Sequence, residues 1–293
     1  MLVLSRKSYK SGKEKSVLFR QKRRLQKNIR KKDYTEKYLY KHTDSVIQKM
    51  QEDILLEKEK AFKAYIFDMD GTVLNTVTDL KNAMNYACEQ TGHRHDFTEE
   101  DAKQFFGSGV LVAIERALAL EKGADYEELL LIGEEKNQEI DQELQEEISR
   151  IRQVYDVYYP LHCNDETAPY PGITSLLKRL REAGIKTAVV SNKPDNAVQK
   201  LTELYFKDLF DYSMGERPEI RRKPAADMVN ACLEALGVKR EEAVYIGDSE
   251  IDMETAANSA LPCISVDWGF RSKSFLEKNG AERIVSSAEE IFD

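Results

Sequence analysis

The sequence predicts an α/β protein whose core is a doubly wound parallel sheet, with an all-helical insertion and a helical extension at the N-terminus. Three observations predict this fold. Short apolar segments alternate with helical segments after residue 167, as in a parallel sheet covered by helices. A long stretch between the first strand and this alternation carries only helical patterns. The first 60 residues contain no proline and differ in charge from the rest of the chain.

Charge divides the 293-residue chain into two parts. The net charge of the chain is −8, yet residues 1–60 hold 18 Lys and Arg against 8 Asp and Glu. Apolar residues recur at helical spacing from Thr35 to Lys60, whereas residues 5–32 are mostly basic and polar. We therefore expect residues 1–60 to be a basic, partly helical extension that packs on the core or on a second subunit in a homodimer. Contact with nucleic acid or an anionic surface through this arm is an alternative function of another class.

The first strand is predicted at Ala64–Phe67, because the segment AYIF is apolar throughout, as in a sheet buried on both faces. Helical periodicity then dominates residues 77–160, in segments separated by glycines. These segments lie near 78–91, 98–106, 109–121 and 134–159. We interpret Tyr155, Tyr158 and Tyr159 at the end of the last segment as packing residues. Phe105 and Phe106, before the GSG turn at 107–109, could either face a substrate or pack within the insertion.

Strands and helices alternate in the last part of the chain. Strands are expected at 186–190, 243–247 and 262–266, with a further short segment at 210–215. Helices are expected at 172–183, 195–206, 225–236 and 250–259. No apolar run approaches the ~18 residues of a membrane span, and the N-terminus lacks the apolar region of a signal peptide. We expect a cytoplasmic protein without membrane insertion.

Polar residues that suit chemistry follow the predicted strands or lie in loops between them. They are Asp68, Asp70, Ser191, Asn192, Lys223, Asp248 and Asp252. Because ligands of a doubly wound sheet bind beyond the carboxyl ends of the strands, these side chains are expected to converge. Three carboxylates, a hydroxyl and a lysine at one edge suit phosphoryl transfer with a hard cation such as Mg²⁺, which prefers oxygen ligands.

Each candidate has a role in such a reaction. Asp68 and Asp248 could hold Mg²⁺ together with the main-chain carbonyl of Asp70, and the metal would let a carboxylate approach an anionic phosphate. Asp68 could attack phosphorus, and Asp70 could protonate the leaving oxygen and later deprotonate water. The N–H groups of Gly71 and Thr72 could cradle phosphate oxygens.

Two further residues would act on the phosphoryl group. Ser191 and Lys223 could stabilise the charge on its oxygens in the transition state. Asn192, next to Ser191, is expected among the substrate-binding residues.

Four segments resemble, in order, the motifs of the haloacid dehalogenase-like superfamily. They are DMDGTVLNT, VVSNK, RRKPA and YIGDSEID. The helical insertion resembles the type-one cap of that superfamily, and the phosphoglycolate phosphatase-like enzymes are the most similar branch. The resemblance runs from about Ala61 to Asp293. It implies a Rossmann-like core domain at 61–76 and 166–293, and a helical cap domain at 77–165.

The resemblance implies a Mg²⁺-dependent phosphatase that acts on a small phosphomonoester through an aspartyl-phosphate, with 2-phosphoglycolate as the expected substrate. It also implies that Asp252 supports the metal, through water. A phosphosugar mutase similar to β-phosphoglucomutase, or a pyrophosphatase, stays open on the same core. Asn75 stands where many relatives carry an acidic residue, next to the expected hinge of the cap.

Overall fold

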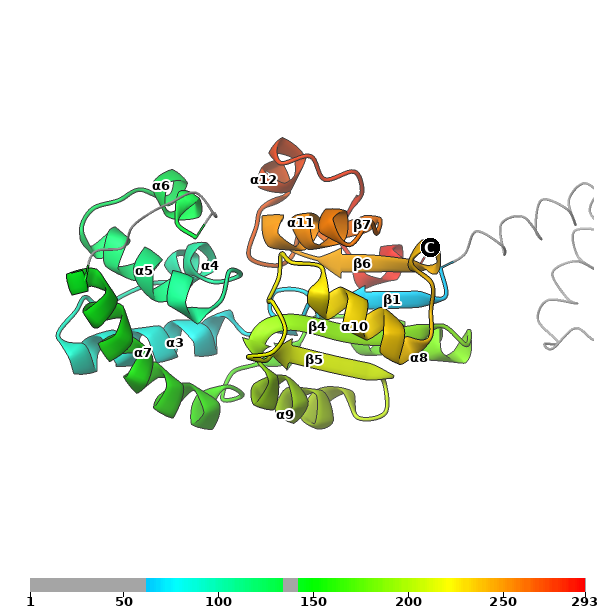
Figure 1. Ribbon diagram of the computed structural model, residues 1–293, viewed down its shortest axis with the longest axis horizontal. Coiled ribbons are helices and arrows are strands. Elements are labelled where there is room, and N and C mark those ends of the chain that lie inside the picture. The colour runs from blue at the N-terminus through cyan, green and yellow to red at the C-terminus, as the bar shows by residue number, and fades with distance from the viewer. Residues whose placement is uncertain (1–61, 134–141, 293) are drawn as a thin grey trace, which may run out of the picture. The chain divides into compact units, whose positions relative to one another are not determined.

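The computed structural model describes residues 62–133 and 142–292, so the predictions made for residues 1–60 and 134–141 lie outside it. Within the described residues, six parallel strands form one sheet in the order β5-β4-β1-β6-β7-β8 (Figure 1). The strands are β1 (Ala64–Phe67), β4 (Lys186–Pro194), β5 (Tyr212–Glu216), β6 (Ala243–Gly247), β7 (Cys263–Val266) and β8 (Ile284–Val285). The predicted α/β class with a Rossmann-like parallel sheet is confirmed.

Helices cover both faces of this sheet, which is why its central strands are apolar at every position. Tyr65 and Phe67 of β1 belong to the same core cluster as α8 (Ile173–Glu182) and α9 (Asp195–Phe206). Ala64 and Ile66 point to the other face. There they share a second cluster with apolar residues of α10 (Asp227–Leu236) and α11 (Glu250–Asn258), which lie in front of the sheet in Figure 1.

The order of the strands creates a switch point at β1. After β1 the chain adds β4 and β5 on one side, and it then returns to add β6, β7 and β8 on the other. Phe67, the last residue of β1, pairs with Val189 of β4 and with Ile246 of β6, so β1 and β6 end at nearly the same level while β4 continues to Pro194. Loops that leave neighbouring strands in opposite directions open a crevice at their carboxyl ends, where ligands of such sheets bind.

An all-helical insertion occupies the chain between two short strands, β2 (Leu74–Asn75) and β3 (Ala168–Pro169). Its helices are α3 (Val77–Thr91), α4 (Glu99–Phe105), α5 (Val110–Glu121), α6 (Tyr126–Leu131) and α7 (Gln142–His162). They form a separate group at one end of the sheet (Figure 1). Because β2 and β3 pair antiparallel, the chain leaves and re-enters the core side by side.

The Asp79 carboxylate ties these two connections together. It accepts the N–H of Glu166 at 3.0 Å, and both the N–H and the hydroxyl of Thr167, at 3.0 and 2.7 Å. Asp79 is only 2 % exposed, so these donors replace the water that its charge would otherwise require.

Some elements differ from the prediction. β4 continues to Pro194 instead of ending at Val190, because Ser191, Asn192 and Lys193 are buried although they are polar. α6 was not predicted, since its six residues are too few to show a helical period, but Asp125 and Glu128 form a capping box at its start. β8, with two residues, and α12 (Lys273–Lys278) are also too short to show a period in the sequence.

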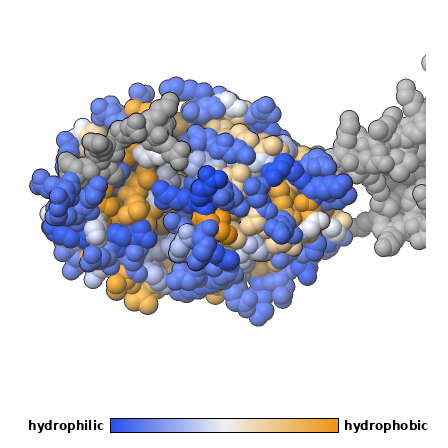
Figure 2. All heavy atoms as spheres, viewed as in Figure 1, coloured by the Kyte–Doolittle hydropathy of each residue, from blue (hydrophilic) through white to orange (hydrophobic). Residues whose placement is uncertain are grey.

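The surface has the polarity expected of a core enclosed by helices. On the face shown in Figure 2, hydrophilic residues dominate and apolar residues gather in separate areas. Among the residues described, no helix combines the length and the apolar character needed to cross a lipid bilayer.

Candidate active site

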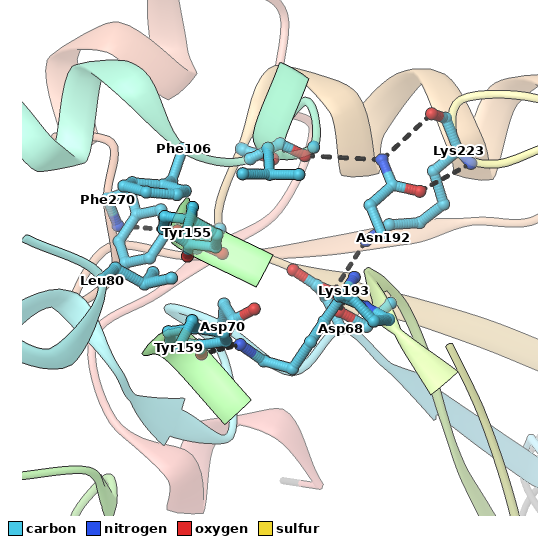
Figure 3. Close-up of a pocket in the computed structure, with 17 residues that line it drawn as sticks. Asp68, Asp70, Leu80, Phe106, Tyr155, Tyr159, Asn192, Lys193, Lys223 and Phe270 are labelled. Carbon is cyan, nitrogen blue, oxygen red and sulfur yellow. Dashed lines mark hydrogen bonds and ion pairs between the residues drawn. The ribbon is translucent and has the colours of Figure 1, made fainter. Parts of the chain in front are cut away.

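A cavity of about 50 Å³ lies where the carboxyl ends of the central strands face the helical insertion (Figure 3). Six of the predicted site residues line it: Asp68, Asp70, Ser191, Asn192, Lys223 and Asp248. The insertion contributes Phe106, Tyr155 and Tyr159 to the opposite wall. The cavity is therefore formed jointly by the sheet and the insertion.

Three buried carboxylates form a cluster at this cavity, and two of them, Asp68 and Asp248, line it. Asp68, Asp248 and Asp252 each offer an oxygen within 4.8 Å of the others. Burial raises the pKa of Asp68 to about 7, against the opposing effect of the Lys223 ammonium. Burial, together with the charges of Asp252 and Asp68, also raises the pKa of Asp248 well above its usual value. The cluster holds more negative charge than its surroundings compensate, as expected of a cation site.

Lys223 supplies the positive charge inside this cluster. Its Nζ lies 2.7 Å from Asp68 Oδ1 and 2.8 Å from Asp252 Oδ1, and it donates to the Tyr245 hydroxyl at 3.2 Å. Burial alone would lower the pKa of Lys223, but Asp252 and Asp68 outweigh it and raise this pKa well above the usual value. Lys223 therefore stays charged although its side chain is only 2 % exposed.

Asn192 holds the loop that carries Lys223. Its Nδ2 donates to the Lys223 carbonyl at 3.1 Å, and its Oδ1 accepts the Lys223 N–H at 2.9 Å. This two-point contact joins the end of β4 to the loop before α10. Ser191 is also buried at the end of β4, where its Oγ accepts the Lys193 N–H at 3.3 Å.

Asp248 is held in one orientation by groups on both sides. Its Oδ1 accepts the Thr72 hydroxyl at 3.0 Å, and its Oδ2 accepts the Phe270 N–H at 2.6 Å. Two glycines make room for this carboxylate. A Cβ on Gly71, whose φ is +82°, would lie 2.4 Å from Asp248 Oδ2, and a Cβ on Gly269 would lie equally close. Any larger residue at either position would displace the carboxylate.

The chain belongs to the haloacid dehalogenase-like hydrolase family, because the model of that family matches residues 65–266. That stretch contains the insertion, most of the sheet and every predicted site residue from Asp68 to Asp252, whereas β8, Gly269 and Phe270 lie beyond it.

Similar proteins agree with this assignment. A phosphoglycolate phosphatase of Chromobacterium violaceum is 29% identical over 235 residues, which cover 80% of this chain and 96% of the relative. A phosphoglycolate phosphatase of Agrobacterium fabrum is 30% identical over 214 residues, covering 72% of this chain and 83% of the relative.

A crystal structure of a Lactobacillus delbrueckii subsp. bulgaricus protein, provisionally assigned as a phosphoglycolate phosphatase, is 55% identical. It superposes with a TM-score of 0.77, covering 79% of this chain and 97% of the other. The expected enzyme class, a phosphoric monoester hydrolase in the phosphoglycolate phosphatase-like branch of the haloacid dehalogenase-like hydrolases, is thereby confirmed.

Three predicted site residues of this hydrolase lie outside the cavity lining. The Gly71 N–H donates to the Leu74 carbonyl at 2.9 Å and the Thr72 N–H to the Met69 carbonyl at 3.3 Å. These amides are therefore engaged within the turn in this structure, and their part in binding phosphate stays a prediction. The two residues also shape the position of Asp248.

Asp252, the third of these residues, forms hydrogen bonds that hold the surrounding backbone in place. Its Oδ2 accepts the N–H groups of Asp248 and Ser249, both at 3.1 Å, and the Ser249 hydroxyl at 2.7 Å. Its Oδ1 accepts from Lys223 and from the Tyr245 hydroxyl. Asp252 is thus the N3 residue of the capping box whose N-cap is Ser249, at the start of α11. It also pairs with Lys223 and belongs to the acidic cluster.

Two residues of the site were missed by the sequence analysis. Lys193 Nζ lies 3.1 Å from Asp70 Oδ1 and donates to the Tyr159 hydroxyl. A signal for Lys193 was present, because it directly follows Ser191 and Asn192 at the end of a buried strand. The interpretation of Tyr159 as a packing residue was incomplete, since this residue also lines the cavity. Phe106 faces the cavity, whereas Phe105 is fully buried.

Proposed function

We propose that this hydrolase is a Mg²⁺-dependent phosphatase for a small phosphomonoester, with 2-phosphoglycolate as the preferred candidate. The observation that carries the proposal is the convergence of Asp68, Asp70, Lys223 and Asp248 on one small cavity at the switch point of the sheet. The names of the two curated relatives support the choice of substrate.

The donor set fits Mg²⁺. Asp68 and Asp248 offer carboxylate oxygens to a buried site with excess negative charge, and Asp70 follows Asp68 closely enough to add its main-chain carbonyl. Hard cations of this kind take oxygen ligands. When bound, Mg²⁺ would neutralise charge on the phosphate and so allow a carboxylate to approach it.

The residues of the chain can carry a two-step reaction. An Asp68 oxygen attacks phosphorus, and the bond from phosphorus to the ester oxygen breaks with its electron pair on that oxygen. Asp70 gives this oxygen a proton, so the alcohol leaves and an aspartyl-phosphate remains. Water then attacks phosphorus, Asp70 takes its proton, and phosphate leaves with the Asp68 carboxylate restored. Lys223 and Ser191 lie where they can stabilise charge on the phosphoryl oxygens.

The helical insertion, residues 77–165, acts as a cap in this proposal. Its residues Phe106, Tyr155 and Tyr159 close the cavity opposite the strand ends, and closure of such elements excludes bulk water from the reaction. A mutase or pyrophosphatase would share the first step. A mutase would pass the phosphoryl group to a second substrate instead of to water.

The test of the proposal is phosphate release from a panel of small phosphomonoesters that includes 2-phosphoglycolate, glycerol phosphates and sugar phosphates. We expect release that requires Mg²⁺, with 2-phosphoglycolate hydrolysed with the highest kcat/KM. A different rank order would reassign the substrate. No release from any ester by the folded protein would overturn the phosphatase proposal.

Mg²⁺ is expected to stabilise the protein more at pH 8 than at pH 5.5. Burial raises the pKa of Asp68 to about 7 in the folded protein, whereas its pKa in the unfolded chain is near 4. The contribution of this carboxyl group to the free energy of unfolding is therefore fully present below pH 4 and is lost as the pH rises through 7. The ionised cluster at pH 8 then binds the cation, and at 100 times the dissociation constant Mg²⁺ adds about 2.7 kcal/mol. Melting temperatures with and without Mg²⁺ at the two pH values measure this effect.

The matched control for this measurement is Asp68→Asn, in which the titrating carboxylate is absent. Mg²⁺ should raise the melting temperature of this variant less than that of the wild type. The difference between the two pH values should also be smaller in the variant. An equal response of both proteins, or an equal response at both pH values, would contradict the assignment of Asp68 to the cation site.

A further inference from the structure

Asp70 is the group that transfers protons in the proposed reaction, and a carboxylate can do this only when one oxygen faces the ester. Lys193, which has no part in the proposed reaction, lies next to its other oxygen, and Tyr159 in turn contacts Lys193. Lys193, at the end of β4, places Nζ 3.1 Å from Asp70 Oδ1, and the Lys193 side chain is only 2 % exposed. Figure 3 shows this ammonium lying between Asp70 and the Tyr159 hydroxyl.

Tyr159 holds the ammonium from the side of the insertion. Its hydroxyl accepts a hydrogen bond from Lys193 Nζ, and Nζ also lies 4.6 Å from the centre of its ring. Tyr159 stacks on Tyr155 with ring centres 5.2 Å apart, and both are buried in the wall of the cavity. Burial raises the pKa of Tyr159 well above its usual value, so it remains a neutral phenol.

We propose that Lys193 and Tyr159 are positioning residues for Asp70, and that the insertion thereby takes part in orienting the group that transfers protons. This proposal rests on the phosphatase function proposed above. Lys193, Tyr159 and Asp70 come from β4, from α7 and from the turn after β1, so their contact exists only when the insertion lies against the strand ends.

The ammonium orients the carboxylate of Asp70. An ammonium carries a positive charge and has donors but no acceptor, so it attracts the Asp70 oxygen that faces it, Oδ1. Held in this way, the carboxylate leaves Oδ2 to face the ester oxygen in the first step and water in the second.

The closing experiment compares two substrates of similar size that differ in their need for a proton. The alkoxide of 2-phosphoglycolate needs one as it leaves, whereas acetyl phosphate releases acetate, which is stable as an anion. Because kcat/KM covers binding and the steps up to cleavage of the ester bond, it includes the first proton transfer and excludes the second. We expect Lys193→Met to lower kcat/KM about 100-fold for 2-phosphoglycolate and less than about 5-fold for acetyl phosphate.

Tyr159→Phe keeps the ring and removes only the hydroxyl. It should produce the same selective loss at a smaller size, about 10-fold for 2-phosphoglycolate. Lys200→Met is the matched control, because exposed Lys200 also joins the core to the insertion, through the Pro160 carbonyl at 3.0 Å, but does not contact Asp70. This control should change kcat/KM by no more than about 2-fold for either substrate.

The outcomes separate this proposal from the function on which it rests. If Lys193→Met lowered kcat/KM equally for both substrates, or for neither, the positioning role would be overturned, and the wild type would still be a phosphatase. Activity on acetyl phosphate also reports that a variant is folded. If Lys193→Met fails to fold, Tyr159→Phe provides the test. An equal change in kcat/KM for both substrates in that variant would overturn the proposal. A wild type that hydrolyses neither substrate would overturn the proposed function itself.

Discussion

Asp68→Asn is expected to lower phosphate release by about 10⁴-fold or more, because an amide lacks the nucleophilic oxygen of the carboxylate. The protein should nevertheless remain folded. The Asp68 carboxylate is buried beside Asp252 and Asp70, and its raised pKa shows that the charge is unfavourable there. The neutral, equally large asparagine relieves that repulsion, so the melting temperature of the metal-free variant at pH 8 should not fall. Steady-state phosphate release and thermal unfolding measure the two effects.

The control for Asp68→Asn is the same substitution at Asp227 in the first turn of α10. Asp227 pairs with Arg221 at the surface, at 2.9 Å, and is not among the residues that line the cavity. Its replacement should leave phosphate release unchanged. If Asp68→Asn kept more than about a hundredth of the wild-type rate, Asp68 could not be the nucleophile.

Lys223→Met is expected to lower the free energy of unfolding of the metal-free protein by about 3–5 kcal/mol, as well as to abolish activity. The substitution keeps a long apolar side chain but removes the ammonium between Asp68 and Asp252. Two buried carboxylates would then face each other without the positive charge that compensates them. Urea unfolding in the presence of a chelator measures the loss.

Two further variants test the cause of that loss. Arg221→Met removes a positive charge two residues away, from a side chain that is 79% exposed, and should cost less than about 0.5 kcal/mol. Lys223→Met combined with Asp252→Asn should recover part of the stability, because the second substitution removes one of the uncompensated charges. A loss below about 1 kcal/mol for Lys223→Met would show that the ion pairs contribute little.

The core of the fold could be predicted because its signals are local. The strand Ala64–Phe67 and the strand at 243–247 are apolar runs of strand length, and the structure places them at the predicted residues. The helix at 195–206 also has its predicted bounds. The end of β4 could not be read in this way. Its polar residues Ser191–Lys193 are buried only because the insertion and the loop before α10 cover them.

The sequence by itself determined the alternation of strands and helices, the family, and the positions of Asp68, Asp70, Ser191, Lys223 and Asp248, because each of these depends on residue type and on spacing along the chain. It could not determine which donors and acceptors remain free. In the structure the N–H groups of Gly71 and Thr72 donate to carbonyls of a turn, which spacing along the chain did not reveal.

Only the tertiary structure decided that Lys193 and Tyr159 meet at Asp70. The three residues belong to segments far apart in the chain, and neither pattern nor charge connects them. A hydrogen bond or an ion pair depends on separations of about 3 Å, and such separations between distant segments arise only when the packing of the insertion against the sheet is known.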